Sequence, residues 1–199
     1  MNKFLTDNQF AEIAKSFNLN IAHIKAIFKV EAGGRSGFLK DNLNLPVTLQ
    51  EGHVFYKYAK RKGLDVETIC KEHPNICYPK WTKCFYKKGI SEYNRYLSAK
   101  SIDEECAMLS TSWGIGQIMG FNYRLCGYDS LQSFVEKMHN SEYYQLQAMC
   151  NFIANNKNMY DALCKEDWAK FAKLYNGPGY TQNKYDKKLE KAYKQYFIQ

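Results

Sequence analysis

The sequence contains no long apolar run. Its 199 residues include no segment that approaches the roughly 18 consecutive apolar residues needed to span a bilayer. The N-terminal stretch Met1-Asn2-Lys3-Phe4-Leu5-Thr6-Asp7 reaches polar residues after two apolar positions, so it lacks a signal-peptide core. We therefore expect a protein that is made in the cytoplasm and is not a membrane protein.

The sequence also lacks linkers, low-complexity tracts and internal repeats. We therefore predict a single domain over residues 1–199. No helix-turn-helix, zinc-finger or RNA-binding signature is present, and the basic residues are dispersed, which argues against nucleic-acid binding. Because the net charge is +8 and aromatics make up 16% of the chain, non-catalytic binding to nucleic acid or to an anionic cell wall stays as an alternative.

The cysteines do not indicate a complete disulfide framework, because their number, seven, is odd and no secretion signal accompanies them. Four potential zinc ligands fall within fifteen residues: Cys70, His73, Cys77 and Cys84. Their spacing is not that of a standard zinc finger, and Pro74 and Pro79 interrupt it. We favour free thiols or a local disulfide over a structural metal, and we predict no metal and no cofactor.

Helical patterns fill most of the chain. The capping box Thr6-x-x-Gln9 precedes apolar residues at helical spacing, and Asn20 is placed to cap a second helix that ends before Gly33-Gly34. Ser101-x-x-Glu104 is interpreted as another capping box. Further helices are predicted near residues 53–61, 65–72, 91–99, 101–109, 130–139, 141–156, 166–175 and 184–197. The fold class is therefore mainly α, with an irregular or short-hairpin segment over residues 32–49.

Glu31 is the first candidate catalytic residue. It follows Ile24 by seven residues and Ile27 by four, so it projects from the apolar side of its helix. It also lies in the last turn, where unpaired carbonyl groups disfavour a negative charge. Both effects raise the pKa of a carboxyl group, as a general acid for glycosidic cleavage requires. The alternative is a glutamate that faces solvent at a frayed helix end.

Two distant segments carry residues suited to a binding cleft. Residues 112–120 surround Trp113 and Gln117 with three glycines, which allow close approach of a ligand to the backbone. Residues 174–180 end a helix in a tight turn beside Tyr175 and Asn176. Trp113 offers an aromatic face for stacking, whereas Trp81 and Trp168 are predicted to lie in the core.

A glutamate at a helix end, then Gly-x-x-Gln, then Tyr-Asn-Gly, resembles goose-type lysozymes and soluble lytic transglycosylases. The sequence resembles still more closely the N-acetylmuramidase family of phage endolysins. This resemblance runs from about residue 8 to residue 194 and is carried by the following stretches: 30–34, 37–39, 51–56, 112–120, 134–138, 141–142, 167–171, 175–180 and 185–186.

The resemblance implies an α+β lysozyme-like fold and an enzyme that cuts the β-1,4 bond between N-acetylmuramic acid and N-acetylglucosamine. Glu31 corresponds to the catalytic acid of the family, and Glu51 falls at its second acidic position. Gln117 matches a residue that contacts the muramoyl sugar, and Tyr175 and Asn176 match cleft residues that face the acid. The substrate-binding set predicted in this way comprises His53, Ser112, Trp113, Gln117, Met119, Tyr175 and Asn176.

Two departures from the family pattern are visible. The segment between Glu31 and Glu51 is a few residues longer than in relatives and contains Asn42-Leu43-Asn44-Leu45-Pro46. Many relatives also carry a separate peptidoglycan-binding domain, which we do not find in this chain. Glu51 favours hydrolysis, whereas lytic transglycosylation uses the same acid on the same bond and remains the alternative. For His53 and His73, structural hydrogen bonding is favoured over catalysis.

The resemblance also implies a partner and a location. We expect a monomer that acts on peptidoglycan in the periplasm after its release from the bacterial host cytoplasm, with an exported antibacterial effector as the alternative. The C-terminal helix is rich in lysine, at positions 184, 187, 188, 191 and 194. Its basic side is either a solvated surface or a surface that attracts an anionic wall or outer membrane.

Overall fold

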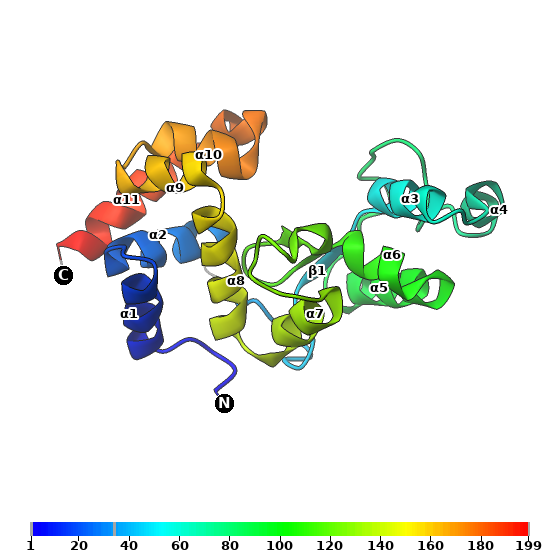
Figure 1. Ribbon diagram of the computed structural model, residues 1–199, viewed down its shortest axis with the longest axis horizontal. Helices are drawn as coiled ribbons and strands as arrows, with labels where there is room; N and C mark the ends of the chain where they lie inside the picture. Colours follow the sequence, from blue (N-terminus) through cyan, green and yellow to red (C-terminus); the bar gives the residue numbers. More distant parts are fainter. Residues whose placement is uncertain (1, 34, 199) are drawn as a thin grey trace.

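Two groups of helices lie on either side of helix α8 (Glu142–Ala154), as Figure 1 shows. The computed structural model describes residues 2–33 and 35–198. One group comprises α1 (Asp7–Ser16), α2 (Ile21–Glu31), α9 (Lys157–Cys164), α10 (Trp168–Asn176) and α11 (Tyr185–Phe197). The other comprises α3 (Gly52–Arg61), α4 (Val66–Glu72), α5 (Ile90–Ile102) and α6 (Glu104–Leu109). Helix α7 (Leu131–Asn140) and the short helix η1 (Gly120–Asn122) also lie between the two groups. The short helix η2 (Pro178–Asn183) joins α10 to α11. The mainly helical fold predicted from the sequence is confirmed.

Helix α8 contributes to both hydrophobic cores. Leu146, Met149 and Ile153 are buried with the helices of the terminal group, whereas Ala148 is buried with the core of the other group. Phe152 packs against both clusters. A helix that is apolar around most of its circumference is stable only when it is covered on several sides, so α8 holds the two groups together.

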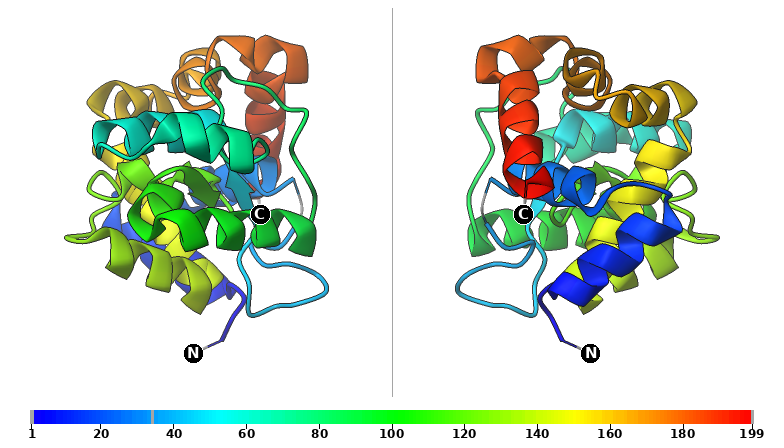
Figure 2. Two further views of the ribbon diagram at one scale, coloured as in Figure 1. Left: turned by 90° about the vertical axis from the view of Figure 1, so that its right-hand side faces the viewer. Right: turned by 90° about the vertical axis from the view of Figure 1, so that its left-hand side faces the viewer.

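Helix α11 fixes the position of α2. The two helices pack against each other, and Figure 2 shows α11 in red beside the blue α2. Leu189, Ala192 and Tyr193 of α11 are buried in this contact, and the ring of Tyr193 lies 4.5 Å from the ring of His23, centroid to centroid. Burial lowers the pKa of His23, which favours its neutral form in this apolar setting. The C-terminal helix therefore supports the helix that carries Glu31.

A small antiparallel sheet stands between the helical groups. Its strands are β1 (Thr48–Gln50), β2 (Thr111–Trp113) and β3 (Ile118–Met119), in the order β1-β2-β3. Leu49 pairs with Ser112, which in turn pairs with Met119. The segment before β1 folds back on itself through an antiparallel bridge between Phe38 and Pro46, in agreement with the expected hairpin. The sheet therefore joins two segments that are about 60 residues apart in sequence.

The caps predicted for the first two helices are confirmed. Thr6 and Gln9 form the predicted capping box of α1, and the side chain of Asn20 accepts a hydrogen bond from the backbone of Ala22. Helix α2 ends at Glu31 with Gly33 in a left-handed conformation, φ +57°. Gly34, which we also expected to stop this helix, lies outside the described residues.

Two expectations about helices were wrong. Ser101 caps no helix, because α5 continues to Ile102 and the Ser101 hydroxyl donates to the carbonyl of Ser98. Asp103 caps α6 instead, accepting a hydrogen bond from the backbone of Cys106 at 2.9 Å. Helix α9 was missed, because the polar run 155–158 that precedes its buried residues is typical of a loop.

A buried ion pair lies beneath β1. Arg95 and Glu92 of α5 are 2.6 Å apart, with side chains only 4% and 3% exposed. The same guanidinium donates to the side-chain oxygen of Gln50 and to the carbonyl of Asn75, and the Glu92 carboxylate accepts from the backbone of Gln50. The pair thus satisfies the buried polar groups that attach the sheet to α5.

Replacing Arg95 with leucine should destabilise the protein by about 3–5 kcal/mol, because Glu92 is left as a buried charge without its partner. Urea unfolding of R95L against wild type measures this loss. K194Q is the control, since it removes the exposed Lys194–Glu190 pair on α11 and should leave stability unchanged. Equal stabilities of R95L and K194Q would show that the buried pair does not support the sheet.

Candidate active site

The ends of two helices meet at Glu31. Glu31 is the last residue of α2 and Asn176 is the last residue of α10. The side-chain amide of Asn176 donates to both carboxyl oxygens of Glu31, at 3.3 Å and 3.2 Å. Ile27 and Ile24, one and two turns back on α2, are fully buried, so the helix face that carries Glu31 is the face that packs against the core. The sequence therefore placed Glu31 correctly on the apolar side.

This setting raises the pKa of Glu31 to about 7. Burial is the main cause, because it removes water from the charged form, and the hydrogen bond from Asn176 opposes it. Glu31 and Asn176 are each the last residue of a helix, and the end of a helix disfavours a negative charge. Glu31 therefore keeps a transferable proton near neutral pH, which a carboxyl at its ordinary pKa of 4.5 does not.

Tyr175 ties α10 to the loop between β2 and β3. Its hydroxyl donates to the carbonyl oxygen of Gly116 at 3.1 Å. A side chain at position 116 would press against this hydroxyl and against Met149, so the glycine permits the close approach. Burial raises the pKa of Tyr175 well above its ordinary value, and the charge of Glu31 adds to this, so the hydroxyl stays a donor. The three distant segments singled out in the sequence are thus brought together.

Gln117 lines the cleft and holds its loop in place. Its side-chain amide donates to the carbonyls of Gly114 at 2.8 Å and Val47 at 3.3 Å, and its oxygen accepts from Ser112 at 3.0 Å. The backbone of Gln117 is left-handed, with φ +46°, which is unfavourable for a residue other than glycine. Ser112 is buried and acts here through Gln117, so the structure gives it a positioning contact.

A cleft of about 510 Å³ opens beside Glu31. Its walls come from the end of α2, the hairpin before β1, the strand β1, the loop 114–117 and the start of α5. Thr48 is one of the lining residues, and its buried hydroxyl has no hydrogen-bond partner among residues 2–33 and 35–198. Charged residues in its lining that the sequence did not single out are Arg35, Lys40, Asp41, Lys87, Lys88 and Glu92. They lie in loops or at a helix start, where no periodic pattern marks them.

The beginning of α8 holds two walls of the cleft together. One carboxyl oxygen of Glu142 accepts hydrogen bonds from the Ser36 hydroxyl at 2.8 Å and from the backbone of Gly37 at 2.9 Å. One turn further, the side-chain oxygen of Gln145 accepts from the backbone of Ile115 at 3.0 Å. Both side chains are buried. The hairpin and the loop 114–117 are therefore fixed relative to each other by one helix.

Glu51 is near the cleft but is not part of its lining. Its carboxylate accepts a hydrogen bond from the Tyr86 hydroxyl at 2.6 Å and lies 3.3 Å from Nδ1 of His53. The His53 contact lacks the geometry of a hydrogen bond. Glu51 and His53 thus form a local cluster at the start of α3, separate from the contact between Glu31 and Asn176.

The stacking role predicted for Trp113 was wrong. Trp113 is 1% exposed and its ring packs edge-on against Tyr96 in the core, so it offers no face to a ligand. Trp81, predicted to be a core residue, is instead 63% exposed, whereas Trp168 is buried as expected. Met119 is half-buried on β3 opposite Ser112. Isolated tryptophans in glycine-rich or proline-rich segments carry no periodicity that would separate buried from exposed positions.

The cysteines occur as free thiols in the described part of the chain. The sulfur atoms of Cys70 and Cys77 lie 3.3 Å apart, whereas Cys84 is exposed. No group of three or more histidine, cysteine or acidic side chains among residues 2–33 and 35–198 is placed to hold a metal ion. In the same residues, no helix is both long and apolar enough to cross a membrane.

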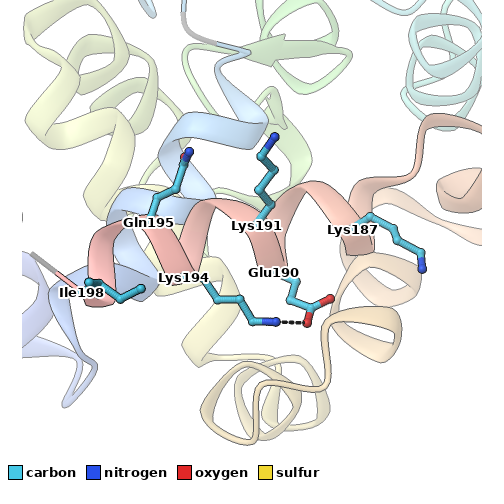
Figure 3. A pocket seen from close by; sticks show the side chains of 6 residues that line it. All are labelled: Lys187, Glu190, Lys191, Lys194, Gln195 and Ile198. Atoms are coloured by element: carbon cyan, nitrogen blue, oxygen red, sulfur yellow. Dashed lines mark hydrogen bonds and ion pairs between the residues drawn. The ribbon is translucent and has the colours of Figure 1, made fainter.

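The C-terminal helix uses its apolar side within the protein. Leu189, Ala192 and Tyr193 are buried, and Figure 3 shows the opposite, polar side, where Lys194 reaches Glu190 at 2.6 Å. Lys187 and Lys191 are exposed, and their side chains extend away from the helix in the same view. The apolar side is therefore not free to enter a lipid layer. The exposed groups that this helix offers to a membrane or wall are its lysines and, at its end, Phe197 and Ile198.

Replacing Asn176 with alanine should raise the pKa of Glu31 further, because it removes the hydrogen bond that stabilises the carboxylate. Carboxyl-carbon NMR titration of labelled glutamate measures the change. N155A is a suitable control, since the Asn155 amide bonds the carbonyl of Leu125 and does not contact Glu31. A lower or unchanged pKa in N176A would contradict the assigned role of this contact.

Comparisons with known proteins identify the family of this chain. The family model for N-acetylmuramidase matches residues 20–197. The crystal structure of the Burkholderia AP3 phage endolysin superposes with a TM-score of 0.91 and 37% sequence identity, covering 100% of this chain and 74% of that one. No curated protein matches the sequence significantly. Since the family model covers nearly the whole chain, the protein belongs to the N-acetylmuramidase family.

Proposed function

We propose that the protein is a peptidoglycan hydrolase of the endolysin type. It cleaves the β-1,4 bond between N-acetylmuramic acid and N-acetylglucosamine, with Glu31 as the general acid. The observation that carries this proposal is the buried Glu31, with a pKa raised to about 7, which lines a cleft of about 510 Å³ and is hydrogen-bonded by Asn176. Membership in the N-acetylmuramidase family and the similarity to a phage endolysin support the substrate class.

The proposed chemistry begins with the proton of Glu31. Glu31 donates it to the glycosidic oxygen as the bond from that oxygen to the anomeric carbon of N-acetylmuramic acid breaks. The oxygen leaves as the C4 hydroxyl of N-acetylglucosamine. Positive charge at the anomeric carbon is then removed by an incoming nucleophile, and the resulting carboxylate of Glu31 is stabilised by the amide of Asn176.

Two nucleophiles are chemically possible. In hydrolysis, water adds and gives a proton to a second carboxylate; in transglycosylation, the C6 hydroxyl of the same sugar adds and no second carboxylate is required. We favour hydrolysis because Asp41 lines the same cleft as Glu31. Glu51, engaged with Tyr86 outside the lining, is better suited to supporting the local structure than to activating water.

The cellular role follows the same proposal. An enzyme of this class is suited to lysing a bacterial host after release from the cytoplasm to the periplasm, and it acts there as a monomer. An exported antibacterial effector would use the same chemistry. The genomic neighbourhood of the coding sequence distinguishes the two roles.

Replacing Glu31 with glutamine should lower the rate of peptidoglycan clearing by about 10²–10⁴-fold, because the variant has no proton to donate. Turbidity of purified sacculi measures the rate. E72Q, which makes the same change at an exposed position on α4, is the matched control and should clear normally. Clearing by E31Q at the wild-type rate would remove Glu31 from the mechanism.

The pH dependence of its stability provides an independent check that E31Q is folded. The folded-state pKa of Glu31, about 7, is above its ordinary value of 4.5, so the contribution of Glu31 to stability is greatest below pH 4.5 and is lost as the pH rises through 7. Because glutamine does not ionise, the stability of E31Q does not fall in this way. At pH 8 it should therefore be more stable than wild type by about 1–3 kcal/mol, and at pH 4 the two should be similar.

Mass spectrometry of the released fragments distinguishes the two nucleophiles. Hydrolysis yields reducing N-acetylmuramic acid ends, and 1,6-anhydromuramoyl ends would instead establish transglycosylation. If Asp41 activates water, D41N should lose about 10²–10⁴-fold in rate, whereas E51Q should lose much less. The reverse order would assign the second catalytic carboxylate to Glu51.

A further inference from the structure

Two cysteine side chains touch each other where α4 ends. The thiol of Cys70, in the last turn of α4, donates to the sulfur of Cys77 in the segment that follows, and the two sulfur atoms lie 3.3 Å apart. The turn between them is closed by hydrogen bonds from the backbone of Ile76 and Cys77 to the carbonyl of His73, at 2.9 Å and 3.0 Å. The backbone itself therefore brings the two sulfur atoms together, and a short further approach would join them at the length of a disulfide bond, about 2.05 Å.

The two thiols differ in their access to solvent. Cys70 is half-buried, whereas Cys77 is only 1% exposed. Burial raises the pKa of the Cys77 thiol well above its ordinary value, and the hydrogen bond with Cys70 raises it further, so Cys77 stays protonated. A dissolved reagent consequently reaches Cys70 first. An accessible thiol that lies against a buried second thiol is suited to forming a disulfide by exchange.

The other cysteines are placed differently. Cys84 and Cys164 are exposed, and Cys126 and Cys150 are buried in the two hydrophobic cores. Cys106 lies in the same core as Cys77, but it is buried and its pKa is raised to about 12, mainly by that burial. Within residues 2–33 and 35–198, the cysteine pair whose sulfur atoms are in hydrogen-bonding contact is Cys70 and Cys77.

The segment that carries Cys77 supports the sheet and the start of α3. The carbonyls of residues 75 and 76 accept hydrogen bonds from Arg95 at 2.8 Å and from the side chain of Gln50 at 3.4 Å. The hydroxyl of Tyr78 accepts a hydrogen bond from the first backbone N–H of α3 at 3.3 Å. This segment has no regular secondary structure, so such contacts fix its conformation. A covalent link from Cys77 back to α4 would hold it in place more firmly.

We propose that Cys70 and Cys77 form a disulfide bond when the protein passes from a reducing to an oxidising compartment. The Cys70 thiolate attacks one sulfur of an oxidant that is itself a disulfide, and one thiolate leaves. The sulfur of Cys77 then attacks the Cys70 sulfur, and the second thiolate leaves. Two protein thiols are thereby oxidised, the oxidant is reduced to two thiols, and the protons of the cysteines pass to the released thiolates. The bond itself is independent of the proposed function, whereas the change of compartment rests on that function.

Peptide mapping of the whole protein tests the bond directly. Reduced protein is incubated with oxidised glutathione, and free thiols are then blocked. Trypsin cleaves after Lys71 and Lys80, so residues 63–71 and 72–80 should appear as two peptides that are held together until a reductant is added. The same joined peptides should appear in C164S, which removes an exposed thiol at the end of α9, and should be missing from C70S.

Thermal unfolding supplies a second measurement. A disulfide that closes this turn restricts the unfolded chain, so oxidation should raise the Tm of wild type and of C164S by about 4–10 °C. The Tm of C70S should not respond to the oxidant. Cys70 is chosen for replacement because it is half-buried, so serine at this position should leave the fold intact, whereas a change at the buried Cys77 would disturb the core.

Several results would overturn the proposal. One is a glutathione adduct that persists on Cys70 without closing the bond, and another is a bond from either cysteine to Cys84 or Cys106. A rise in Tm of the same size in C70S would assign the stabilisation to another site. Because none of these measurements uses peptidoglycan, a failure of the proposed enzymatic activity would leave their outcome unaffected.

Discussion

The contact between Glu31 and Asn176 is the constraint on which the site depends. It requires two helices, whose last residues are 145 positions apart in sequence, to end beside each other around a buried carboxyl group. Such an arrangement is costly for a charged carboxylate and inexpensive for a protonated one. The packing of α11 on α2 and the bond from Tyr175 to Gly116 keep the two helix ends in place. The same packing that stabilises the terminal group of helices therefore also sets the protonation of Glu31.

Helix α8 holds two other walls of the cleft in place. Glu142 and Gln145 bind backbone groups of the hairpin and of the loop 114–117, two segments with little regular structure of their own. Loops of this kind adopt a single conformation only when buried polar groups satisfy their backbone. Because α8 also contributes to both hydrophobic cores, the walls of the cleft are built directly on the most buried helix of the protein.

The sequence predicted those features that depend on short-range patterns. The capping box at Thr6, the cap at Asn20 and the orientation of Glu31 follow from helical periodicity, and the order of Glu31, Gln117 and Tyr175 follows from the family resemblance. Features that depend on tertiary contacts were not predictable in this way. Trp113 is buried because α5 supplies Tyr96 against its ring, and Asp41 and Lys87 reach the cleft only because the hairpin and α5 are folded around it. Asp103 replaced Ser101 as a cap because α5 continued one turn further than its apolar pattern indicated.

The basic side chains of the cleft and the burial of Glu31 have opposite effects on the pKa of Glu31. Nearby positive charge favours the ionised form of a carboxyl group and would lower the pKa of Glu31 toward its ordinary value. The pKa stays near 7 because burial between two helix ends is its main determinant, while the lysines at the cleft are exposed to solvent. Exposed charges are screened over about 8–10 Å at physiological salt, so they act on a ligand that touches them more than on a buried group behind the cleft wall. Because the acid is buried and the basic side chains are solvated, a protonated Glu31 and a basic cleft can coexist in one site.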